Sequence, residues 1–261
     1  MRFFQIFFHK QYRQLLIELT RREIVQRYKQ SILGYFWVIL NPLAQMLVMS
    51  FVFSQLFNVS NLGVPYSIYL FAGLLPWTLF ANSLIGSTSS LVSNAGLLAK
   101  IYFPREVLVA SIILSKIVDF FLASSIFILL MFFFHIQISW QILWLIPIFL
   151  IQNLFTYALG LLFAAFNLFY RDVQYLLSLI LMIWMYLTPI VYAPEAFPAH
   201  YRWIFQLNPM AVLVNAYRQV VLVGSAPNLS SLALAALLAS LLALAAFRLF
   251  KKLEGQFADA V

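Results

Sequence analysis

The chain of 261 residues contains no cysteine, which excludes disulfides, thiol catalysis and thiolate metal sites. Charged side chains are also scarce, at 9% of the residues. None occurs within residues 30–99, 120–170, 173–194 or 219–247. Because about 20 apolar residues cross the roughly 30 Å of hydrocarbon in a bilayer, these runs predict membrane-spanning helices rather than the core of a water-soluble domain.

Two further absences limit the chemistry. The 8 glycines are scattered and no GxxxxGK[ST] sequence occurs, so the chain has no recognisable site for ATP phosphates. The histidines His9, His135 and His200 are far apart, and no cluster of acidic residues offers metal ligands or a general base. We therefore expect no metal site and no catalytic residue, which argues against a membrane-embedded glycosyltransferase.

Apolar residues make up 64% of the chain, which predicts an all-α integral membrane protein. Six spans fit the uncharged runs, at residues 35–57, 66–89, 108–134, 142–169, 174–193 and 229–250. These spans and their short connections use nearly the whole chain. Residues 1–261 are therefore expected to form a single transmembrane domain.

The basic residues predict the orientation. With these spans, 14 of the 16 Lys and Arg residues fall on one side, and only Arg202 and Arg218 fall on the other. The positive-inside rule then places both termini in the cytoplasm. The net charge of +8 accordingly reflects membrane orientation, since nucleic-acid binding would need a contiguous basic surface.

Residues 1–34 precede the first span. Their beginning has only a short apolar stretch and no small-residue cleavage site, so it does not resemble a signal peptide. Apolar residues then recur every four positions within residues 24–32, which predicts an amphipathic helix on the inner leaflet. Thr20 and Glu23 fit a capping box at its start, and Gly34 permits a bend into the membrane. The helix is either a basic anchor on anionic lipid or a docking element for a cytoplasmic partner.

Residues 93–107, SNAGLLAKIYFPREV, join the second and third spans on the cytoplasmic side. Pro104 suits the first turn of the third helix, and Glu106 is favourable at its positive end. The loop either presents its apolar residues to a soluble protein or lies half-buried among lipid headgroups. Those residues are Leu97, Leu98, Ile101 and Tyr102.

Residues 194–228 are harder to interpret. Asn208 and Pro209 are typical of a helix start and Gly224 of a helix stop, but the helix between them is too short for a full span. A full span would also carry Arg218 into lipid and place the basic C-terminal residues outside. We therefore predict two half-depth helices that dip from the outer face as a re-entrant hairpin. Alternatively, their aromatic side chains form an interfacial belt.

Polar and small residues follow one face of two predicted spans. They are Thr78, Asn82, Gly86, Ser89 and Ser93 in the second span, and Asn153, Thr156, Tyr157, Gly160, Ala164, Asn167 and Arg171 in the fourth. Such residues either let helices approach closely or line a hydrophilic passage. In the third span, Lys116 and Asp119 are three positions apart and are expected to form a structural ion pair.

The fifth span places aromatic, sulfur-containing and hydroxyl side chains on one face. They are Tyr175, Ser178, Met182, Met185 and Tyr186, followed by Pro189. This mixture suits sliding sugar rings better than ions, for which charged rings or a carbonyl filter would be expected.

Four segments carry a resemblance to a known family. They are RREIVQRYKQSILGYFWVILNPL at residues 21–43, LLAKIYFPREVLVAS at 97–111, NLFYRDV at 167–173 and TPIVYAPEAFPAHYRWIFQLNPMAVLVNAYRQVVL at 188–222. Together they resemble the membrane (permease) subunit of bacterial ABC-type polysaccharide exporters, which are the O-antigen, capsule and teichoic-acid permeases. The resemblance covers nearly the whole chain.

The resemblance implies a homodimer of this subunit with two copies of a separate ABC ATPase. The ATPase would bind ATP and magnesium, and no cofactor is expected in this chain. The cargo would be a polysaccharide linked to a polyprenyl-diphosphate lipid. It would cross the bacterial plasma (inner) membrane from the cytoplasm.

The resemblance also implies residue roles. The ATPase interface would comprise Arg22, Glu23, Arg27, Tyr28, Lys100, Phe103, Pro104, Arg105 and Glu106. The channel lining would comprise Trp37, Tyr175, Ser178, Met182, Met185, Tyr186 and Tyr192. The outer gate would comprise Tyr201, Trp203, Asn208 and Pro209. The guanidinium groups of Arg21 and Arg22 are expected to attract the lipid diphosphate.

Two other interpretations stay open. One is an ABC exporter of teichoic acid or a small amphiphile, and the other is a passive channel or a membrane scaffold. Dependence on an ATPase separates them, because a channel conducts alone.

Overall fold

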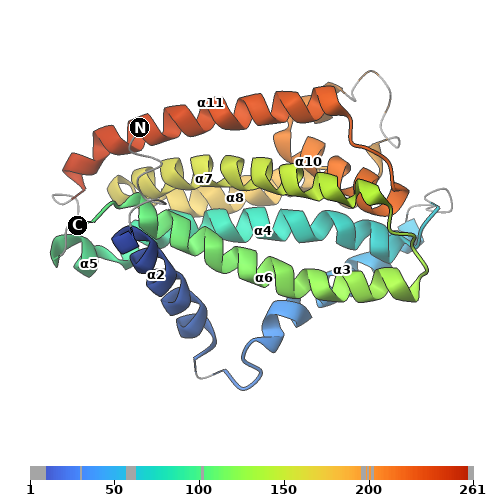
Figure 1. Cartoon of the computed structure of the whole chain (residues 1–261), viewed down its shortest axis with the longest axis horizontal. Helices are drawn as coiled ribbons and strands as arrows, with labels where there is room; N and C mark the ends of the chain where they lie inside the picture. Colours follow the sequence, from blue (N-terminus) through green and yellow to red (C-terminus); the bar gives the residue numbers. More distant parts are fainter. Residues whose placement is uncertain are drawn as a thin grey trace.

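The structure of the chain, a computed structural model, describes residues 10–29, 31–56, 63–100, 103–194, 198, 200 and 203–257. All the regular elements within these residues are helices. Most of them run along one common direction, as Figure 1 shows. The all-α prediction is confirmed for the described part of the chain.

Five helical segments of the described residues are long and apolar enough to cross a membrane. They are α3 (Phe36–Leu56), α4 (Tyr66–Ser93), α6 (Glu106–Phe133), the short η1 (Trp140–Trp144) with α7 (Leu145–Phe169), and α11 (Leu229–Leu253). Five of the six predicted spans are thus confirmed as helices, with ends displaced by a few residues.

The remaining predicted span, residues 174–193, is helical only in its first part, so the prediction is wrong for the second part. The helix α8 extends only over Val173–Leu187, which at about 1.5 Å per residue is shorter than the hydrocarbon core. Thr188 leaves the helix with an extended backbone, and Pro189 follows it. A residue before proline is disfavoured in the helical region, which explains why the helix ends here.

The N-terminal helix begins at an earlier residue than predicted, and one of its faces packs against another helix. The helix α2 extends over Lys10–Tyr28, so Thr20 lies inside it and donates a hydrogen bond to the Leu16 carbonyl at 2.7 Å. The predicted capping box is therefore wrong. Leu16 and Leu19 are buried, because one face of α2 packs along α6. After α2, Gly34 has a positive φ of 49°, which confirms the predicted bend.

The loop before α6 is partly helical. The helix α5 covers Ala95–Lys100, and Leu98 is buried in an apolar cluster, so it is not presented to a partner in this structure. Ile101 and Tyr102 lie outside the described residues. Glu106 lies in the first turn of α6, as predicted, but Pro104 lies two residues before the helix begins, so its predicted place in the first turn is wrong.

The region before α11 contains three short helices. They are α9 (Trp203–Leu207), α10 (Pro209–Arg218) and a single π-helical turn, η4 (Gln219–Val223). The predicted start is confirmed, because the Asn208 side chain accepts hydrogen bonds from the backbone N–H groups of Met210 and Ala211. Gly224 ends the segment in the left-handed conformation, as predicted.

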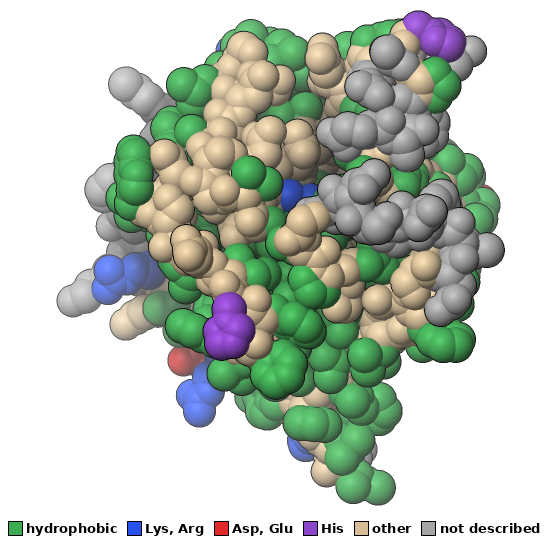
Figure 2. All heavy atoms as spheres, turned by 90° about the vertical axis from the view of Figure 1, so that its right-hand side faces the viewer, with side chains coloured by type: hydrophobic (Ala, Val, Ile, Leu, Met, Phe, Trp, Pro, Cys, Tyr) green, Lys and Arg blue, Asp and Glu red, His purple; other side chains and the backbone are tan. Residues whose placement is uncertain are grey.

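The helix α4 forms the centre of the bundle. In its most apolar stretch 78% of the residues are buried, against 11% for α3, which therefore lies at the edge. Figure 1 shows α2 and α5 at one end of the bundle, and α11 finishes at the same end. Figure 2 shows the opposite end, where most visible side chains are hydrophobic or uncharged and few are Lys or Arg.

Candidate functional site

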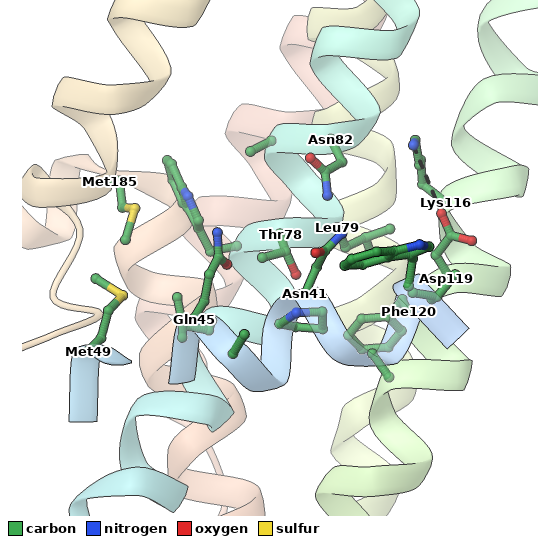
Figure 3. Close-up of a pocket in the computed structure, with 18 of the residues that line it drawn as sticks. Asn41, Gln45, Met49, Thr78, Leu79, Asn82, Lys116, Asp119, Phe120 and Met185 are labelled. Atoms are coloured by element: carbon green, nitrogen blue, oxygen red, sulfur yellow. Dashed lines mark ion pairs between the residues drawn. The ribbon is translucent and has the colours of Figure 1, made fainter. Parts of the chain in front are cut away.

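A cavity of about 1000 Å³ lies between α3 and the helices α4, α6 and α8. Figure 3 shows Asn41 and Gln45 of α3 facing Thr78 and Asn82 of α4. The indole rings of two tryptophans also contribute to the wall. Amides and hydroxyls offer hydrogen bonds, and indoles offer apolar faces, so the cavity suits a ligand with both hydroxyl groups and apolar faces.

Charged groups gather at one end of this cavity, and Figure 3 shows Lys116 and Asp119 of α6 there. Arg27 of α2 forms an ion pair with Asp119 and also donates to Ser115 Oγ at 3.1 Å. Lys116 Nζ lies 3.9 Å from Asp119 Oδ2, which confirms the predicted pair. Two cations and one carboxylate thus give the lining a net charge of +1.

The proposed channel residues lie on two surfaces, which are the wall of the cavity and the exposed face of α8. Met185 and Trp37 line the cavity, and Figure 3 shows Met185 opposite Met49. Four others lie exposed along α8: Tyr175, Ser178, Met182 and Tyr186. The Tyr192 hydroxyl donates to the Tyr186 carbonyl at 2.7 Å, so Tyr192 ties the segment after α8 back to that helix.

Of the proposed ATPase-interface residues in the loop before α6, some are exposed and others are buried. Lys100 is exposed, but Phe103 and Glu106 are buried. Glu106 accepts from Lys251 Nζ at 2.7 Å, and Lys251 also reaches Glu254 at 2.9 Å. The backbone N–H of the half-buried Arg105 donates to the Glu254 carboxylate at 3.3 Å, and its guanidinium donates to the Glu254 carbonyl. These bonds attach the loop to the end of α11, so buried Glu106 positions the loop.

The arginine side chains of α2 also differ in what they contact. Arg21 is exposed, whereas Arg22 donates to Asn94 Oδ1 and lies 3.5 Å from Glu23. Arg27 lines the cavity. The side chain of Tyr28 is outside the described part of the structure.

Among the proposed gate residues, Asn208 joins two elements. Besides capping α10, its carbonyl oxygen accepts from Trp184 Nε1 at 2.9 Å and its amide donates to Thr188 Oγ1 at 3.0 Å. Pro209 is the first residue of α10, and Trp203 is exposed on α9. Tyr201 lies outside the described residues. The end of α8 is therefore attached to the start of α10.

Arg218 forms a second attachment, which sequence reasoning missed. Only 4% of this residue is exposed. The guanidinium donates to the carbonyls of Tyr69, Pro189 and Ile190 at 3.2, 2.5 and 2.5 Å and lies against the Tyr69 ring. A Cβ on Gly73 would lie 2.5 Å from Arg218 Nη2, so only glycine leaves room for this arrangement. The residue thus joins α10, α4 and the segment after α8.

The polar and small residues predicted along one face of two spans have different roles in α7 and in α4. In α7, Asn167 donates to the Thr88 carbonyl at 3.0 Å, and a Cβ on Gly160 would lie 3.1 Å from Ser87, so this stripe serves helix packing. In α4, Gly86 likewise packs against α6. Thr78 and Asn82 of the same stripe line the cavity instead.

Asn41 and Gln45 were also not identified from the sequence as candidate site residues. They are four positions apart in an apolar segment, a spacing that places both on one helix face and could have identified them.

Comparison with known proteins agrees with a membrane transport protein. The family described as ABC-2 type transporter matches residues 14–222. An O-antigen export system permease protein, RfbA, of Klebsiella pneumoniae is 32% identical over 247 residues, which cover 94% of each chain. The RfbA of Myxococcus xanthus is 31% identical over 253 residues, with 96% of each chain covered. The polysialic acid transport protein KpsM of Escherichia coli is 24% identical over 247 residues, covering 88% of this chain and 91% of its own.

The matched region includes all the helices that enclose the cavity. The relatives are matched over nearly their whole length. The chain is therefore a multi-pass membrane protein that belongs to the ABC-2 type transporter family.

Proposed function

We propose that this chain is the membrane-spanning subunit of an ATP-driven exporter. Its cargo is an O-antigen-like polysaccharide linked to a polyprenyl-diphosphate lipid, and the exporter acts in the bacterial plasma membrane. The observation that carries the proposal is the similarity to two O-antigen export permeases over 94% and 96% of this chain. The polar cavity beside α3 supports it, because a polymer of sugars needs hydroxyl partners within the membrane.

The proposed topology has six crossings with both termini in the cytoplasm. α8 makes the fifth crossing together with the segment that follows it, α11 makes the sixth, and α9 and α10 form the outer re-entrant hairpin. Two observations support this arrangement. The first long helix of the described chain, α2, and the end of the last, α11, lie at the same end of the bundle, and few basic side chains are visible at the other end.

The proposed conduit forms between two copies of the chain. α3 is the least buried of the five long helices, and α8 exposes Tyr175, Met182 and Tyr186. Pairing these surfaces in a homodimer would enclose an aromatic lining. The exposed residues of α2 and Lys100 form the proposed surface for the two ATPase subunits, which bind ATP and magnesium.

Purification of a C-terminally tagged chain from native membranes tests this function. We expect an ABC ATPase to accompany it in equal amount and transport to stop when that ATPase is absent. Mass spectrometry and reconstitution in vesicles measure the two results. Stable recovery of the chain alone, with conduction in the absence of any ATPase, would instead support a passive channel.

The roles of Arg21 and Arg22 give a second prediction. Replacing both with Gln should reduce recovery of lipid-linked glycan with the purified complex by about thirtyfold, because each basic residue near a charged lipid surface contributes about 1 kcal/mol and the two together about 2 kcal/mol. Association with the ATPase should persist, because the other exposed residues of α2 and Lys100 remain. Arg171→Gln, at an exposed position after α7, is the control. Undiminished glycan recovery from the double variant would remove these two residues from lipid recognition.

A further inference from the structure

We infer that the cavity beside α3 is a binding site for a phosphorylated saccharide, with Lys116 as its anion ligand. The inference rests on the proposed function and deepens it, because it assigns part of the cargo to particular side chains. Neither the matched family nor the relatives' names assign this site. The end of the cavity next to α2 and its middle offer different chemistry.

The end next to α2 is suited to an anion. Arg27 is engaged by Asp119, and the Lys116 ammonium lies farther away, at 3.9 Å from the same carboxylate. One cation therefore balances the carboxylate, and the second leaves a net positive charge in the lining. The Lys116 side chain is only 18% exposed, so solvent screens this charge less than at an open surface. A phosphate oxygen is a suitable partner for such an ammonium group.

The middle of the cavity is suited to hydroxyl groups. Within the described residues, the side chains of Asn41, Gln45 and Asn82 make no hydrogen bond, although they lie on membrane-length helices. Polar groups in such helices are costly unless they have partners. Each amide offers two donors and one acceptor, which match sugar hydroxyls that both donate and accept.

Two indole rings complete the site. Trp37 of α3 and Trp77 of α4 line the cavity together with the amides. The C–H faces of a sugar ring are apolar, so they can pack on indole while the hydroxyls bond to the amides. The volume of about 1000 Å³ lies at the upper end of the range of ligand pockets, which leaves room for more than one sugar.

Titration of the purified full-length chain in mild detergent tests the site. The probe is N-acetylglucosamine 1-phosphate, and the readout is the change in tryptophan emission, to which Trp37 and Trp77 of the cavity wall contribute. We expect saturable binding, with N-acetylglucosamine and inorganic phosphate each bound at least tenfold more weakly. Lys116→Gln should weaken binding of the sugar phosphate about tenfold through loss of a charge-assisted hydrogen bond, and should leave the neutral sugar unaffected.

Two variants serve as controls. Lys116→Arg keeps the charge and should bind within about threefold of the unmodified chain, which separates loss of charge from a folding defect. Lys252→Gln makes the same change at an exposed position and should have no effect. Absence of saturable binding, or equal binding by the chain with and without Lys116→Gln, would overturn the inference. Inorganic phosphate bound as tightly as the sugar phosphate would overturn the saccharide part.

A third probe, the same sugar joined to farnesyl diphosphate, identifies the source of the ligand. Tighter binding than the soluble probe indicates a lipid-borne saccharide, and equal binding indicates a free one. Because these titrations need no ATPase, they fail independently of the proposed function. Normal export by cells carrying Lys116→Gln would overturn the site alone, whereas binding by a chain that exports nothing would overturn the proposed function alone.

Discussion

Replacing Arg218 with Met is expected to lower the free energy of unfolding by about 3 kcal/mol and to abolish export, because the substitution leaves buried carbonyls without donors. The guanidinium donates to the carbonyls of Tyr69, Pro189 and Ile190. Met keeps most of the apolar stem, so the loss reports the polar contacts. Reversible unfolding in mixed micelles measures the stability, and surface glycan measures the export.

Three further variants make this test specific. Arg218→Lys keeps the charge but loses the planar fork of donors, so an intermediate loss is expected. Gly73→Ala should act in the same direction, since its Cβ would lie 2.5 Å from the Arg218 guanidinium. Arg171→Met, at an exposed site, should change stability by less than about 0.5 kcal/mol. If Arg218→Met were as stable as Arg171→Met, the attachment of α10 to α4 would be energetically unimportant.

Replacing Glu106 with Gln is expected to lower stability by about 2 kcal/mol and to weaken association with the ATPase. Glu106 is 1% exposed and accepts from Lys251 Nζ at 2.7 Å, so the substitution removes a buried charge pair. Lys251 retains Glu254 at 2.9 Å, which keeps the loss below that of a fully isolated charge. Unfolding in mixed micelles and co-purification of the ATPase measure the two effects.

A double-mutant cycle with Lys251→Met isolates this pair. The double variant should be less destabilised than the sum of the two single changes, because neither charge is then left alone. Glu18→Gln, on the exposed surface of α2, is the matched control for the unfolding measurement. Additive losses would show that Glu106 acts through packing rather than through Lys251.

Much of the fold could be predicted because hydrophobicity and helix capping are local properties of the sequence. The five long helices follow from uncharged runs of sufficient length, and the start of α10 follows from the Asn208 cap with Pro209 behind it. The capping box at Thr20 failed for a tertiary reason. Leu16 and Leu19 gain burial against α6, and this extends α2 through the predicted start.

The candidate site was only partly predictable. Lys116 and Asp119 were identified as a pair from their spacing, but that spacing says nothing of Arg27, which reaches Asp119 from another helix. Asn82 belonged to a stripe that the sequence left open between helix packing and a hydrophilic passage. Its position opposite Asn41 decides that it lines the cavity, whereas Gly86 of the same stripe packs against α6.

The sequence by itself determined the class of protein and the long apolar helices, because both depend on local composition. Only the tertiary structure decided which polar groups face one another. The burial of Arg218, the attachment of Glu106 to Lys251 and the enclosure of a cavity by α3 all depend on residues far apart in the chain. Such contacts follow from how helices pack in three dimensions, and no single segment specifies them.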